Sequence, residues 1–159
     1  MIGGHRIREH GRNSVDRVEQ VIRMFEQEFS CSQSVFSAFA DPVDLPRETA
    51  LRVASGFGGG LARTGDTCGA VTGAIMALGL RHCGVPAEAD PLSKQQAYPP
   101  VQAFLARFKA LHGTIVCREL LGIDIAVPEG LQQARDQGLF KSRCPAFVRS
   151  AGEILEELL

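Results

Sequence analysis

The stretch Asp66-Thr67-Cys68-Gly69-Ala70-Val71-Thr72-Gly73 decides how this chain folds. It opens an apolar segment that runs to about His82 and is unusually rich in glycine and alanine. Each glycine inside a helix costs roughly 1 kcal/mol relative to alanine. A helix that accepts this repeatedly needs close contact with another backbone or with a bound group. We therefore expect a central, buried helix over residues 67–82, stopped by Gly84 and Pro86.

The segments on both sides of this stretch are also helical in pattern, because their apolar residues recur at spacings of three and four. Strand-like alternation occurs only over Ile123–Val127, which is too short to imply a sheet. The sequence therefore predicts an all-α single domain, a bundle of about six to eight helices over residues 13–159, behind a loose polar leader over residues 1–12. The other expected helices span residues 13–29, 30–40, 46–57, 100–112, 114–122, 129–137 and 145–158.

The expected helix starts follow from capping side chains. Asn13 or Ser14 is the expected cap of the first helix, and Ser30 that of the second. Thr64, Asp66 and Thr67 are expected to cap the central helix. Residues 84–97 are polar and contain prolines, so they are predicted to form a connection.

Composition excludes several classes of function. Of 159 residues, 45% are hydrophobic and 22% are charged, with a formal net charge of −1, so no nucleic-acid partner and no anionic membrane surface is indicated. The longest apolar run, Gly69–Leu80, is shorter than the roughly 20 residues of a membrane span. The N-terminus does not resemble a secretory signal, so we expect a cytoplasmic protein. In that reducing compartment cysteines more often bind metals or do redox chemistry than form permanent disulfides.

Four cysteines share a local setting. Cys31, Cys68 and Cys144 fall within the first turn of a predicted helix, and Cys117 lies about one turn into a short one. The positive end of a helix dipole stabilises a thiolate and lowers its pKa, and Arg118 and Arg143 are expected to add positive charge. Thiolates are both the reactive and the metal-binding form of cysteine. We expect the fold to gather these four thiols at one site around Cys68.

Other interpretations of these features are plainer. Each of the four cysteines shares a helical stripe with apolar residues, as a small buried hydrophobic residue would. Cys83, next to His82, lies outside the pattern and is interpreted as incidental. His112 is predicted to be a charge at a helix C-terminus, favourable to the dipole. The run Gly56–Gly60 lacks the Lys-Ser/Thr ending of a phosphate-binding loop and is predicted to be a tight connection that lets the chain approach the cysteine site.

The order of Cys31, the Cys68–Gly73 motif, Cys117 and Cys144 resembles the C_GCAxxG_C_C family of redox-active proteins, which is named for four cysteines and a CGAxxG motif. The resemblance extends over roughly residues 14–158. It implies a helical domain with a redox or cluster-binding role, often encoded near transporter genes. A related domain occurs in split-Soret cytochromes, but this chain has no Cys-x-x-Cys-His sequence, so no covalent haem is expected.

Three hypotheses follow. In the first, the protein is a thiol-dependent oxidoreductase with an unidentified redox partner, linked to a transporter system. Cys68 is then the expected primary thiol, in a catalytic set of Cys31, Cys68, Cys117 and Cys144. In the second, the same four cysteines are metal ligands for an iron–sulfur cluster or Zn²⁺. In the third, the chain is a non-catalytic helical interaction module. In each case the small-residue face of the central helix could also form a homodimer contact.

Overall fold

The computed structural model describes residues 16–40, 45–83 and 91–159. Within these ranges the chain forms helices joined by turns and contains no strand, and its extended pairing is a single antiparallel bridge between Thr67 and Val116. The predicted all-α fold is confirmed. The helices are α1 (Arg17–Glu26), α2 (Cys31–Ala38), α3 (Arg47–Ala54), the 3-10 turn η2 (Ser55–Phe57), α4 (Gly58–Leu61), α5 (Gly69–His82), α6 (Pro91–Gln95), α7 (Tyr98–His112), α8 (Cys117–Leu121), α9 (Pro128–Asp136), α10 (Leu139–Ser142) and α11 (Cys144–Leu158).

The first two helices show how local sequence sets their starts. A side-chain oxygen of Asp16 accepts a hydrogen bond from the Glu19 amide at 3.1 Å, so Asp16 caps α1. The predicted cap at Asn13 or Ser14 is wrong, and those two residues lie outside the described ranges. Ser30 caps α2 as predicted, in a reciprocal capping box with Gln33. This box makes Cys31 the first residue of α2.

Helix α5 lies against α2 with almost nothing between the two backbones. A Cβ on Gly73 would lie 2.8 Å from the Ser32 carbonyl oxygen, and one on Gly69 would lie 3.0 Å from the Ser32 amide nitrogen. A Cβ at Gly73 would force the backbone of α2 to shift, and one at Gly69 would make a contact tighter than normal. The close backbone contact predicted for the glycine-rich helix is therefore present.

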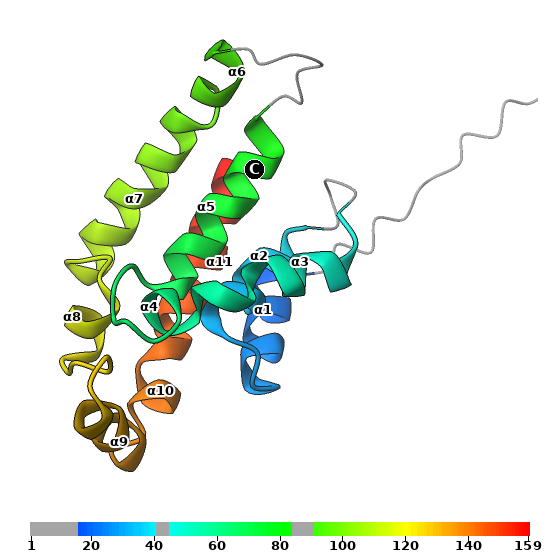
Figure 1. The fold of residues 1–159 in the computed structure, drawn as a ribbon. Coiled ribbons are helices and arrows are strands. Elements are labelled where there is room, and N and C mark those ends of the chain that lie inside the picture. Colours follow the sequence, from blue (N-terminus) through cyan, green and yellow to red (C-terminus); the bar gives the residue numbers. More distant parts are fainter. Residues whose placement is uncertain (1–15, 41–44, 84–90) are drawn as a thin grey trace, which may run out of the picture.

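Helix α11 shares the centre of the fold with α5. In Figure 1 it runs behind α5, with α7 alongside, while α1 to α3 lie on the other side of the pair. It contacts α1, α2, α5, α7 and α10. The largest fully buried side chains come from several of these helices and include Met24, Val35, Leu78, Phe104, Phe108 and Leu155.

Three further predictions need correction. Helix α5 begins at Gly69 with Cys68 in its N-cap position, because Asp66 accepts from the Thr67 amide (2.7 Å) instead of capping the helix. Within the predicted connection 84–97, residues 91–95 form α6, and 84–90 lie outside the described ranges. The short helix α10 was not predicted, since its pattern is too brief to show a period. No helix in the described ranges is long and apolar enough to cross a membrane.

Candidate functional site

Each of the four cysteines stands at the start of a helix. Cys31, Cys117 and Cys144 are the first residues of α2, α8 and α11, and Cys68 is the N-cap residue of α5. Cys117 was predicted one turn further into its helix. None of these four is in a disulfide. Cys68, Cys117 and Cys144 are buried, and Cys31 is half-buried.

Gly69 brings Cys31 close to Cys68. A Cβ on Gly69 would lie 3.1 Å from the Cβ of Cys31, which is tighter than side-chain contacts normally are. The glycine that follows Cys68 thus allows the first turn of α2 to lie against the first turn of α5.

A short antiparallel pairing brings Cys68 close to Cys117. The Cys68 amide donates to the Ile115 carbonyl (2.7 Å), and the Cys117 amide donates to the Asp66 carbonyl (2.6 Å), on either side of the Thr67–Val116 bridge. Cys117 therefore lies opposite Asp66 in this pairing. Side chains alternate between the two faces of an extended segment, so Asp66 and Cys68 lie on the same face. Both thiols consequently lie on one face of this pairing.

Arg143 ties the start of α11 to the end of α8. Its Nη1 donates to the carbonyl oxygens of Leu120 (3.3 Å) and Leu121 (3.1 Å). These bonds satisfy carbonyl groups that the end of α8 leaves without partners. Arg143 therefore positions Cys144 relative to α8. The expectation that the charge of Arg143 stabilises a thiolate is not supported, because the shift in the Cys144 pKa has other causes.

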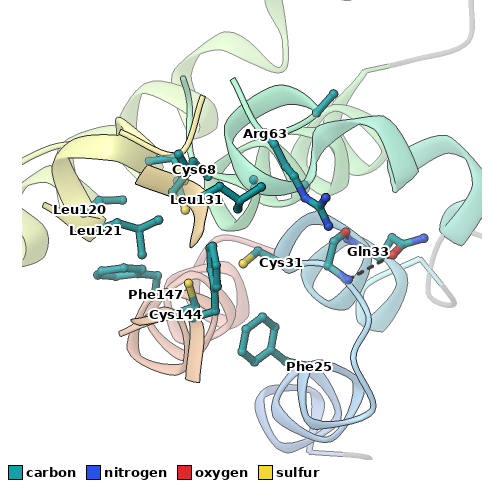
Figure 2. Close-up of a pocket in the computed structure, with 18 of the residues that line it drawn as sticks. Phe25, Cys31, Gln33, Arg63, Cys68, Leu120, Leu121, Leu131, Cys144 and Phe147 are labelled. Carbon is teal, nitrogen blue, oxygen red and sulfur yellow. Dashed lines mark hydrogen bonds between the residues drawn. The ribbon is translucent and has the colours of Figure 1, made fainter. Parts of the chain in front are cut away.

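All four cysteines line one cavity with a volume of about 640 Å³. In Figure 2 the sulfur atoms of Cys31, Cys68 and Cys144 point into the same space, with Phe25, Leu131 and Phe147 around it. The cysteines come from parts of the chain separated by tens of residues. The cavity is thus a place where one small molecule could reach several thiols.

The pKa values of three of the thiols are raised, which contradicts the expectation that the helix starts would lower them. Burial raises the pKa of Cys68 to about 11, partly offset by the backbone N–H groups of Ala70 and Val71. Burial, with the nearby thiols, raises the pKa of Cys117 to about 12. Desolvation outweighs the helix dipole at both positions. At neutral pH Cys68 and Cys117 are therefore protonated.

Cys31 and Cys144 differ from this pattern because they interact directly. The Cys31 thiol donates a hydrogen bond to the Cys144 sulfur, and this bond, together with burial, raises the pKa of Cys31 well above its usual value. The same bond lowers the pKa of Cys144, although burial acts in the opposite direction. Within the pair the proton is therefore held more strongly by Cys31, and Cys144 is the thiol that ionises first.

One wall of the cavity is a left-handed turn. Five consecutive residues have positive φ, and three of them, Leu61 (62°), Ala62 (52°) and Arg63 (65°), are not glycine. Left-handed helical backbone costs roughly 1–2 kcal/mol for each such residue. The neighbouring Gly60 is required by packing, since a Cβ there would lie 2.6 Å from the Cβ of Cys117. The glycine run therefore brings the chain close to the cysteine site, as predicted.

Sequence reasoning missed the three charged residues that line the cavity, Glu28, Arg63 and Arg135. No motif in the sequence around them marks them as site residues. His112 was interpreted wrongly. Its ring lies between Phe108 (4.6 Å between centroids) and Phe147 (5.1 Å), and burial lowers its pKa, so it is not the charge expected at the end of α7. Cys83, at the C-cap of α5, does not line the cavity.

The second hypothesis, a metal centre, requires ligands arranged around one ion. Among residues 16–40, 45–83 and 91–159, no group of three or more His, Cys, Asp or Glu side chains is arranged to hold a metal ion. The donor set in this arrangement thus does not fit a single ion.

Comparison with known protein families identifies this chain's family. The model of the family described as "Putative redox-active protein (C_GCAxxG_C_C)" matches residues 29–158, which is most of the chain. Neither the comparison with curated proteins nor that with solved structures gives a significant match. The matched range contains all four helix-start cysteines and every residue that lines the cavity except Phe25 and Glu28, and the chain belongs to the C_GCAxxG_C_C family.

Proposed function

We propose that this protein is a thiol–disulfide oxidoreductase whose reactive couple is Cys31 and Cys144. The observation that carries the proposal is that Cys31 and Cys144 line one cavity and that their thiols interact, which raises the pKa of Cys31 and lowers the pKa of Cys144. A thiolate beside a protonated thiol is the arrangement in which one sulfur attacks and the other resolves.

The proposed reaction has two steps. The Cys144 thiolate attacks one sulfur of a substrate disulfide, so that a Cys144–substrate disulfide forms and the other half of the substrate leaves as a thiolate. Cys31 then gives its proton to the substrate thiolate that left in the first step and attacks the Cys144 sulfur, which releases the second half of the substrate as a thiolate. Cys31 and Cys144 are oxidised to a disulfide, and the substrate disulfide is reduced by two electrons to one thiol and one thiolate.

Cys68, the thiol chosen from the sequence as primary, takes a different role in this proposal. With a pKa of about 11 it is almost entirely protonated at neutral pH and is a poor nucleophile there. We assign Cys68 and Cys117 to a second pair of thiols that can exchange with an oxidised Cys31–Cys144 disulfide. Both neighbouring thiols influence the pKa of Cys31, which places them within electrostatic reach of it.

The test is single-turnover reduction of a chromogenic disulfide by the fully reduced protein under anaerobic conditions. Cys144→Ser should lose the fast phase of the reaction. Cys31→Ser should keep it but accumulate a stable mixed disulfide at Cys144, visible as added mass. Cys83→Ser is the matched control, because Cys83 does not line the cavity, and it should react as the wild type does. Wild-type rates in Cys144→Ser would overturn the proposal.

A further inference from the structure

We propose that the cavity selects low-molecular-weight disulfides that carry a carboxylate or another anionic group, and that Arg63 and Arg135 bind that group. This inference rests on the proposed function, since it names the class of substrate that the Cys31–Cys144 couple reduces.

The size and lining of the cavity favour a small molecule with an apolar body. Its volume of about 640 Å³ lies within the range of small-molecule pockets, which runs from about 300 to 1,000 Å³. Phe25, Phe140 and Phe147 line it together with Leu131, so a ligand inside would bury apolar surface. A folded protein domain could not enter this space.

Positively charged residues outnumber negatively charged residues around the thiols. Apart from the cysteines, the ionisable side chains that line the cavity are Arg63, Arg135 and Glu28, and all three are exposed. Within the described parts of the chain, neither arginine forms a hydrogen bond or an ion pair through its side chain. Two guanidinium groups are thus available, and a guanidinium matches a carboxylate in a two-point hydrogen-bonded geometry.

The position of Arg63 depends on the left-handed turn. Its own φ is +65°, and its amide donates to the Gly58 carbonyl at 3.2 Å. Figure 2 shows the side chain extending from this turn along the cavity toward Gln33, on the side of Cys31. Backbone strain of this kind clusters at binding sites, where the surrounding structure enforces it. The strained turn therefore directs the guanidinium group of Arg63 along the cavity.

The protonation states of the thiols permit an anionic ligand. Cys31, Cys68 and Cys117 keep their protons at neutral pH, so at most one of the four cysteines, Cys144, carries a negative charge. Two arginines against one thiolate and Glu28 leave no excess of negative charge to repel a carboxylate. The anionic group would bind at the exposed arginines while the disulfide bond reaches the buried sulfur of Cys144.

The experiment compares two aromatic disulfides, the anionic 5,5′-dithiobis(2-nitrobenzoate) and the smaller, neutral 4,4′-dithiodipyridine, in single-turnover reactions with the reduced protein, and each variant is compared with the wild type using the same probe. The charge-removing variants are Arg63→Asn and Arg135→Gln. Asparagine is used at position 63 because it tolerates positive φ better than most residues. Arg63→Lys and Arg135→Lys keep the charge, and Arg52→Gln on α3 is the matched control because that exposed arginine does not line the cavity.

We expect each charge-removing variant to slow the reaction with the anionic probe about threefold, and the double variant about tenfold, as exposed ion pairs allow. The reaction with the neutral probe should change less than about twofold, the lysine variants should recover most of the rate, and added salt should slow only the anionic probe. Arg135→Gln tests the proposal even if Arg63→Asn disturbs the turn.

Two results would overturn the inference while leaving the proposed function intact. Equal slowing with both probes would mean that the arginines act on the thiolate or on the fold. Unchanged rates with the anionic probe would mean that they bind no anion. If peptide mapping instead finds no Cys31–Cys144 disulfide after reaction of the wild type with either probe, the proposed function fails, and this inference fails with it.

Discussion

The hydrogen bond from Cys31 to Cys144 can be tested by removing its donor. In Cys31→Ala the Cys144 thiolate loses the partner that lowers its pKa, whereas burial, which raises that pKa, remains. The pKa of Cys144 should therefore rise. Hydrogen bonds to charged groups contribute about 1.5–3 kcal/mol, and one pKa unit corresponds to about 1.4 kcal/mol, so the expected rise is roughly one to two units.

The assay is the pH dependence of alkylation at Cys144 by iodoacetamide, measured by mass spectrometry so that each cysteine is followed separately. The midpoint for Cys144 should move up in Cys31→Ala, and its alkylation rate at neutral pH should fall about 10- to 100-fold. Cys31→Ser keeps a hydroxyl donor and should show a smaller shift. Cys68→Ala is a second comparison, because Cys68 is not among the causes of the Cys144 shift. A Cys144 midpoint that is unchanged or lower in Cys31→Ala would refute the reasoning.

Three more predictions concern stability. Gly73→Ala should destabilise the protein by about 2 kcal/mol, because its Cβ would meet the α2 backbone at 2.8 Å. Gly79→Ala, with nothing within 4 Å of its Cβ, should stabilise the protein by about 0.5–1 kcal/mol. Urea unfolding measures both changes, and equal effects would contradict the packing argument. Burial raises the pKa of Cys68 from 9.0 to about 11, so the thiol is favoured in the folded state, and stability should fall as pH rises from about 9 to about 11. This loss of stability amounts to about 3 kcal/mol and should be absent in Cys68→Ala. If the stabilities of the wild type and of Cys68→Ala fell equally as the pH rises, the prediction would be contradicted. Arg143→Met removes two hydrogen bonds to carbonyls at the end of α8 and should lower stability by about 1 kcal/mol, measured by thermal unfolding, and an unchanged melting temperature would show that these bonds do not matter.

Local signals in the sequence predicted much of the fold. Ser30 with Gln33 forms the capping box that starts α2, and Gly69 and Gly73 of α5 meet the backbone of α2 as the composition of the helix implied. These features depend on neighbours in sequence or on the absence of a side chain, so the sequence displays them directly. The order of the four cysteines also predicted the family, which the comparison confirms.

The electrostatics of the site could not be predicted in the same way. A helix start lowers the pKa of a thiol when water is near, but Cys68 is 3% exposed, and desolvation reverses the sign of the shift. The interaction of Cys31 with Cys144 joins residues more than a hundred positions apart, so no local pattern reveals it. Arg63 and Arg135 reach the cavity only because a left-handed turn and α9 bring them there, and nothing in their flanking sequence marks them.

The central claim is tested most directly by an equilibrium redox titration of the wild-type protein, quenched with acid and mapped by mass spectrometry. The account predicts a two-electron transition in which the Cys31–Cys144 disulfide forms first, in proportion to the oxidised fraction, while Cys68 and Cys117 remain reduced. Oxidation that begins at Cys68 with Cys117, or four thiols that stay reduced across the whole range of potentials, would contradict it.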